Sequence, residues 1–122
     1  TTGLADPAYI RARSDARRLA GPEGIDAALA AHQLDALVAP TTGVAWPIRS
    51  VGDDFPGESY SAAAVAGYPS LTVPMGVVRG LPIGLAFMGA PDSEAALLAM
   101  GFAFEQATKA RKPPAFRASV LP

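Results

Sequence analysis

Apolar residues recur at helical spacing near both ends of this chain and form short continuous runs in its middle. Asp6-Pro7 has the form of an N-cap followed by proline at the first helical position, which predicts a helix up to Gly21. Pro22 then predicts the start of a second helix, which ends near His32. The positions at helical spacing are Tyr9, Ala12, Ala16 and Leu19 in the first helix. In the second they are Ile25, Ala28, Leu29 and His32, which lie on one face.

Three short apolar runs bounded by glycine and proline predict buried strands. They cover residues 34–39, 70–73 and 82–88, and the turn at 78–81 is short enough for an antiparallel hairpin. A short helix is predicted over 59–66, capped by Ser59 or Ser61 and ended by Gly67. A last helix begins at 91–94 and carries its core stripe on Leu97, Met100, Phe104 and Ala107. This order predicts a layered α/β fold with a mixed β-sheet flanked by helices.

The 122 residues form one segment, which we divide into a helical lead-in (1–33), an α/β core (34–110) and a tail (111–122). Half of the residues are hydrophobic and only 17% are charged. Such a composition fits an alanine-rich α/β domain, but it favours a surface that is partly covered by protein outside this chain. The net charge of −1 and the lack of a basic stripe argue against a nucleic-acid partner. No apolar run reaches the ~20 residues of a membrane span.

The sequence contains no self-sufficient catalytic constellation. Without cysteine there is no disulfide, thiolate metal site or cysteine nucleophile, and we expect neither a metal nor a cofactor. Asp53-Asp54 lack the spacing of a calcium loop, and no phosphate-binding glycine motif occurs. His32, the single histidine, suits packing or charge at a helix end better than catalysis. No serine lies in a Gly-x-Ser-x-Gly setting.

Residues 40–58 form a long stretch rich in proline and glycine, with Trp46 and Phe55 as its large apolar side chains. Loops of this length are uncommon in compact domains and tend to be functional.

Four motifs in series carry a family resemblance: residues 34–41 (LDALVAPT), 63–76 (AAVAGYPSLTVPMG), 80–89 (GLPIGLAFMG) and 103–108 (AFEQAT). Together they resemble the C-terminal third of amidase signature enzymes over roughly residues 25–114. The GDDFPG loop and the FEQATKAR end are most similar to peptide amidase-like members.

The resemblance implies hydrolysis of carboxamides by a Ser–cis-Ser–Lys triad. The triad belongs to a Gly/Ser-rich signature and a lysine that do not occur in this sequence, so no catalytic residue is assigned here. The resemblance also implies that the loop at 40–58 lines the substrate funnel, with Thr41, Trp46 and Phe55 as substrate-binding residues. Trp46 fits equally the role of a core anchor or an interface residue.

The glutamyl-tRNA amidotransferase A subunit is a member of the same family and an alternative identity. Its acidic residue for glutamine corresponds to Gly57 here, which favours a general or peptide amidase.

The partners that follow are the remainder of an amidase chain and a small amide or peptide-amide substrate, with a homo-oligomer as a further possibility. A non-catalytic binding or oligomerisation module remains the alternative from another functional class. The sequence does not determine the compartment, for which the cytoplasm is the default. An incomplete sheet leaves an edge and an apolar face without partners, so the isolated chain should self-associate or be marginally stable.

Overall fold

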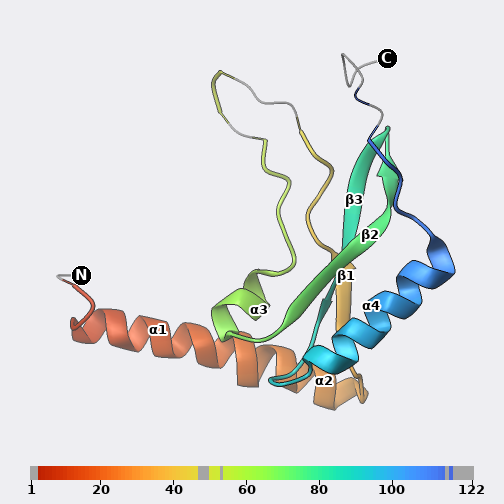
Figure 1. The fold of residues 1–122 in the computed structure, drawn as a ribbon. Helices are drawn as coiled ribbons and strands as arrows, with labels where there is room; N and C mark the ends of the chain where they lie inside the picture. Colours follow the sequence, from red (N-terminus) through yellow and green to blue (C-terminus); the bar gives the residue numbers. More distant parts are fainter. Residues whose placement is uncertain (1–2, 47–49, 53, 115, 117–122) are drawn as a thin grey trace.

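The computed structural model describes residues 3–46, 50–52, 54–114 and 116, and it places helices on both sides of a small sheet (Figure 1). Residues 47–49 and 53 of the predicted loop, and most of the tail beyond 114, lie outside the described residues. In chain order the elements are α1 (Pro7–Ala20), the π-helical segment η1 (Gly21–Asp26), α2 (Ala27–His32), β1 (Leu37–Pro40), α3 (Ser61–Ala66), β2 (Ser70–Val78), β3 (Leu81–Met88) and α4 (Glu94–Thr108).

The sheet has the strand order β1-β3-β2, and both of its pairs are antiparallel. The layered α/β class is therefore confirmed, whereas the described strands do not form the mixed sheet that was expected. β1 and β2 run in the same direction and are joined through α3. They do not pair with each other as parallel strands, because β3 lies between them. The hairpin is also longer than predicted, because β2 continues to Val78 through an irregularity between Pro74 and Gly76.

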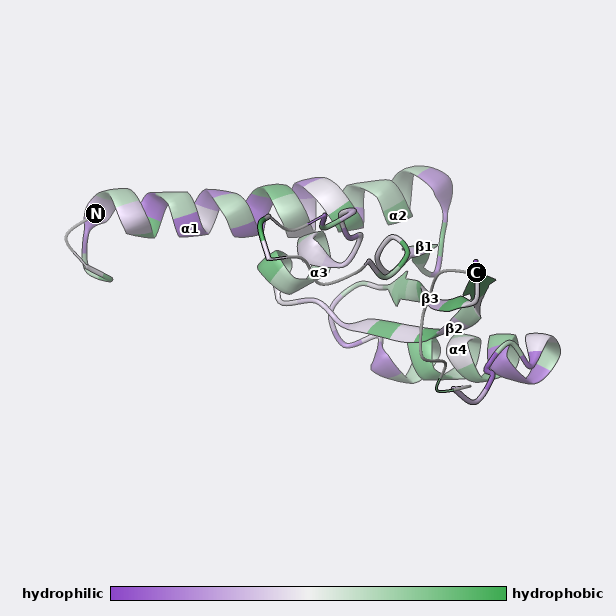
Figure 2. Cartoon of the chain, turned by 90° about the horizontal axis from the view of Figure 1, so that it is seen from above, coloured by the Kyte–Doolittle hydropathy of each residue, from purple (hydrophilic) through white to green (hydrophobic). Residues whose placement is uncertain are grey.

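Successive side chains of a strand point to opposite faces of the sheet, and each face contributes to its own hydrophobic cluster. Val73 and Phe87 face α4 and pack with its Leu97, while Met88 faces the other way, toward Ile25, Leu29 and Ala63. Figure 2 shows the resulting layers, with α1 and α2 on one side of the sheet and α4 on the other. The rings of Phe87 and Phe104 meet edge to face, 6.2 Å apart. The predicted α4 stripe is confirmed for Leu97, Met100 and Phe104, but Ala107 is exposed because the helix runs past the sheet there.

The predicted break between the first two helices is wrong. α1, η1 and α2 follow one another without interruption from Pro7 to His32. The wider π turn accommodates Pro22, which has no N–H to donate and whose ring crowds the preceding turn of a regular α-helix. No residue of α1 is buried, and Leu19 is 56% exposed. In Figure 1 much of α1 extends beyond the sheet. The helix contacts η1 and α3, and its apolar positions lie outside both buried clusters of the described residues.

The start of α3 also differs from the prediction, since neither serine caps the helix. Tyr60 is the N-cap residue and makes no side-chain capping bond. Ser59 instead donates its hydroxyl to the carbonyl oxygen of Pro40 at 2.7 Å, and Ser61 donates to the Glu58 carboxylate. The predicted end at Gly67 is confirmed, with the left-handed φ of 79° that glycine adopts without strain.

A tyrosine–carboxylate contact ties the α3–β2 connection to the π-helical segment. The Tyr68 hydroxyl donates to Asp26 Oδ2 at 2.7 Å, while Asp26 Oδ1 is buried without a hydrogen-bond partner among the described residues. The hydrogen bond to Asp26 raises the pKa of Tyr68 above 10.0, with desolvation and the carboxylate's charge as smaller causes.

We expect the chain to lose stability in alkali as Tyr68 ionises. Because the folded-state pKa lies above the unfolded value, this contribution is complete below the unfolded pKa of 10.0 and disappears as pH rises through the folded pKa. Tyr68→Phe should lower the melting temperature at neutral pH and make its decline above pH ~10 shallower. Melting curves between about pH 8 and 12 test this, with the more exposed Tyr60→Phe as the matched control. An equally steep decline in Tyr68→Phe would contradict the assignment.

Candidate functional site

The two arms of the long connection between β1 and α3 lie side by side and form a shallow, open groove next to the sheet. The Gly43 N–H donates to the Gly57 carbonyl at 3.3 Å, and Thr42 and Glu58 form an isolated antiparallel bridge. The groove has a volume of about 430 Å³. Its lining consists of Ala39, Pro40, Thr42, Gly43, Val44, Pro56, Gly57, Glu58, Ser59 and Ile83. Backbone pairing at 42–43 with 57–58 therefore holds a concave surface open beside the strands.

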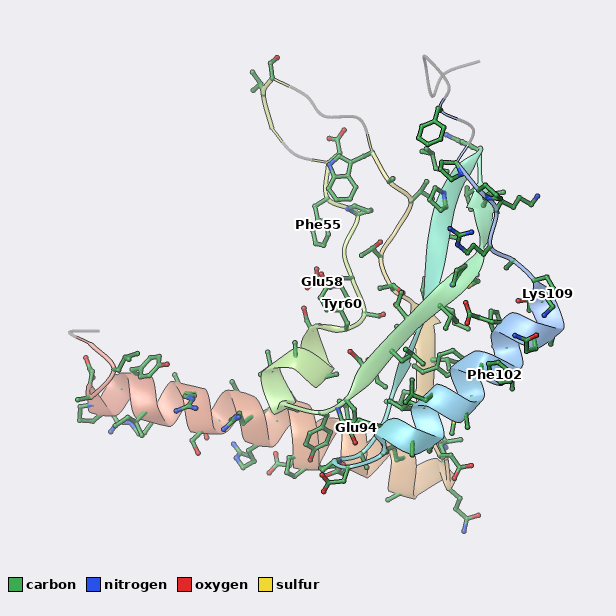
Figure 3. The ribbon with its side chains drawn as sticks, viewed as in Figure 1. Phe55, Glu58, Tyr60, Glu94, Phe102 and Lys109 are labelled. Carbon is green, nitrogen blue, oxygen red and sulfur yellow. The ribbon has the colours of Figure 1, made fainter. Side chains whose placement is uncertain are left out.

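Glu58 is the one charged residue among the described residues that line the groove. The Ser61 hydroxyl donates to its Oε1 and fixes one carboxylate oxygen from the start of α3. Figure 3 shows Glu58 between Phe55 and Tyr60 along the same arm of the loop. The described part of the lining thus combines mostly apolar surface with one carboxylate.

Thr41 lies where β1 ends and joins the sheet to the loop. Its N–H donates to the Gly84 carbonyl at 2.8 Å, and its hydroxyl is hydrogen-bonded to that of Thr72 on β2. This contact passes over Gly84 of the central strand, where a Cβ atom would lie 2.8 Å from Thr41 Oγ1. Glycine is therefore required for the two hydroxyls to meet. One hydroxyl proton is used within the pair and the other stays available as a donor.

Trp46 and Phe55 contact each other across the two arms of the loop. Their ring centroids are 5.5 Å apart, and the planes make an angle of 65°, an edge-to-face arrangement. Neither ring is among the described residues that line the groove, and Thr41 is not among them either, although its neighbours Pro40 and Thr42 are. The structure thus brings Trp46 and Phe55 together, while Thr41 is hydrogen-bonded to Gly84 and Thr72, and a substrate role for the three residues stays a prediction.

The sequence interpretation did not select Thr72 or Glu58. Thr72 carries a weak signal in the sequence, since it is a polar residue inside an apolar run. Glu58 lies next to Gly57, the position considered for glutamine binding, but nothing local to it indicates that it lines a groove. His32 is exposed at the last position of α2, so the packing role predicted for it is wrong. Its predicted place at the end of the helix agrees with the structure.

Within the described part of the chain, no three His, Asp or Glu side chains lie together in a way that would hold a metal ion. None of the described helices has the length and apolar character needed to cross a membrane.

No protein-family model matches the chain. A solved structure, the native peptide amidase of Stenotrophomonas maltophilia, superimposes with a TM-score of 0.88 at 79% sequence identity, over 97% of this chain and 24% of that chain. A probable amidase of Arabidopsis thaliana is 38% identical over 94 residues, which are 76% of this chain and 15% of the relative.

In Desulforudis audaxviator, the glutamyl-tRNA(Gln) amidotransferase A subunit is 47% identical over a shorter stretch of 55 residues, 43% of this chain and 11% of the relative. The chain thus spans about a quarter of the similar peptide amidase and less of the curated relatives. The fold, the order of the motifs and these similarities agree, and the chain belongs to the amidase signature family, where it corresponds to the C-terminal part of a peptide amidase-like enzyme.

Proposed function

We propose that this chain completes the substrate site of an amidase whose reacting residues lie in the rest of the enzyme. The observation that supports this most is the 79% identity to a peptide amidase over 97% of the chain. The reaction is R–CO–NH2 + H2O → R–COOH + NH3, in which the carbonyl carbon exchanges its bond to nitrogen for one to oxygen. A peptide amide or another small carboxamide is the substrate class.

In the proposed reaction a serine oxygen outside this chain attacks the carbonyl carbon and forms an acyl-enzyme. The lysine passes a proton through the bridging serine to the departing nitrogen, which leaves as ammonia. Water then cleaves the acyl-enzyme ester, and backbone N–H groups stabilise the negative oxygen in both steps. Because none of these groups is assigned to a residue of this chain, the chain by itself should not turn over amides.

The contribution of this chain is the wall of the site formed by residues 40–46 and 55–59. The available hydroxyl proton of the Thr41–Thr72 pair suits a carbonyl oxygen of the substrate. The Trp46–Phe55 pair offers apolar surface for a side chain next to the amide. Glu58 supplies a negative charge at the groove and favours a substrate that carries a positive group.

A chimeric enzyme tests the proposal directly. We would replace the matching quarter of the Stenotrophomonas maltophilia peptide amidase by this chain and measure ammonia release from a peptide amide. The chimera should hydrolyse the substrate, and the 122-residue chain alone should not. Trp46→Ala in the chimera should raise KM by about 2- to 10-fold, since an aromatic contact contributes about 0.5–1.5 kcal/mol, while kcat changes little.

Two results would count against the proposal. A folded chimera without amidase activity would refute the assignment as a wall of the amidase site, and turnover by the purified chain alone would refute a triad located elsewhere. Glutamine as a competing substrate distinguishes a peptide amidase from the amidotransferase alternative. That alternative is supported by the 47% identity over 55 residues. Release of ammonia from glutamine in preference to peptide amides would favour that alternative.

A further inference from the structure

Helix α4 is apolar on two opposite faces. Its inner face carries Leu97, which is 2% exposed and packs on the sheet. Its outer face carries Leu98 and Phe102, which are 60% and 64% exposed. Ala95 and Ala99 are exposed beside them, so that residues 95, 98, 99 and 102 follow the i, i+3, i+4, i+7 spacing of one helical stripe. We call these four residues the outer stripe.

An outer stripe of this kind indicates a buried helix. A helix on the surface of a globular protein carries polar residues opposite its core face, whereas one that is apolar all round lies between two layers. Large and small side chains alternate in the outer stripe, as they do where the side chains of a second helix fit into the gaps of the first. The stripe is bounded by charge, with Glu94 at the first position of α4 and Lys109 at its C-cap, as Figure 3 shows.

We propose that the outer stripe is the docking surface for an amphipathic helix from the rest of the amidase chain. This inference rests on the proposed function. The docked helix comes from that enzyme because the chain spans only 24% of the peptide amidase it resembles, which leaves most of such an enzyme outside these residues. The docked helix presents branched apolar side chains to Leu98 and Phe102, with a basic residue near Glu94 and an acidic one near Lys109.

The outer stripe is independent of the groove and of the core of this chain. Leu98 and Phe102 belong to neither of the two buried clusters among the described residues. A polar substitution at Phe102 should therefore leave the isolated chain folded and act only where a second layer covers α4. A comparison of the isolated chain with the chimera therefore distinguishes an effect on docking from an effect on folding.

The test compares Phe102→Glu in two settings, the 122-residue chain alone and the chimeric peptide amidase described above. In the chain alone we expect unchanged helical circular dichroism and melting temperature. In the chimera we expect a clear drop in melting temperature and at least an about 10-fold loss of amide hydrolysis, because a buried charge opposite apolar side chains opens the interface. Ala107→Glu is the matched control, since Ala107 is exposed on the same helix but lies off the outer stripe.

Each outcome decides a separate point. A chimera that keeps its melting temperature and activity with Phe102→Glu overturns the docking surface and leaves the proposed function intact. If the unsubstituted chimera is folded but inactive, the proposed function fails, while its melting temperature still reports whether Phe102 is covered. If the isolated chain forms a dimer that Phe102→Glu dissociates and the chimera is indifferent, the occupant is a second copy and the proposal is wrong.

Discussion

Replacing Leu97 by alanine should lower the free energy of unfolding of this chain by about 2–5 kcal/mol. Leu97 is 2% exposed and packs against Val73 and Phe87, where α4 meets the sheet. Removal of the isobutyl group loses apolar burial and leaves a cavity, because the short strands beneath it are held by their ladder and close the gap only partly. Small domains have total stabilities of about 5–15 kcal/mol, so the variant should lose a large fraction of its stability.

The neighbouring residue supplies the control for this prediction. Leu98→Ala removes the same atoms from a side chain that is 60% exposed, and the isolated chain should lose less than about 0.5 kcal/mol. Urea unfolding followed by circular dichroism measures both variants, and Leu97→Met, which keeps the volume, should cost less than about 1.5 kcal/mol. Equal losses for the two alanine variants would mean that α4 does not face the sheet as described.

Replacing Gly101 by leucine should destabilise the chain by about 1–3 kcal/mol or more, although leucine is a much better helix former than glycine. Gly101 is buried in the middle of α4, where the helix rests on β2. A Cβ atom added there would lie 2.5 Å from Leu71 Cδ2 and 3.2 Å from Val73 Cγ1. Leu71 can rotate away from a single methyl group, but a whole leucine side chain forces the helix off the strand.

Ala103→Leu tests whether the effect of Gly101→Leu comes from close packing. Ala103 is exposed on the same helix, so leucine should be accepted there within about 0.5 kcal/mol. Thermal and urea unfolding of the two variants give the comparison. A Gly101→Leu variant as stable as the parent would show that α4 and β2 are farther apart than the structure places them.

Local features of the sequence determined the ends of several elements. Asp6 caps α1 by accepting a hydrogen bond from the Ala8 N–H at 2.8 Å, as its position before Pro7 predicts. The hairpin from 70 to 88 and the end of α3 at Gly67 follow from turn residues in the same way. These features are readable because their hydrogen bonds and steric limits involve residues a few positions apart.

The candidate site could be predicted only in part, for the same physical reason. The loop at 40–58 was recognisable from its prolines and glycines, but the pairing of Thr42 with Glu58 and of Thr41 with Thr72 joins residues that are distant in the sequence. Such contacts depend on the strand order β1-β3-β2, which no local pattern encodes. The Thr41–Thr72 contact in addition needs a glycine at position 84, a requirement visible only once the three strands lie side by side.

The sequence by itself determined the family, through four motifs in a fixed order, and the positions of most helices and strands. Tertiary structure decided which apolar residues are covered. Leu97 and Leu98 are chemically identical neighbours, yet Leu97 is 2% exposed and Leu98 is 60% exposed. Leu19 of α1 has the spacing of a core residue and is nevertheless 56% exposed. Helical spacing defines a face, but burial requires a surface that packs against it, and that surface is contributed by strands distant in the chain.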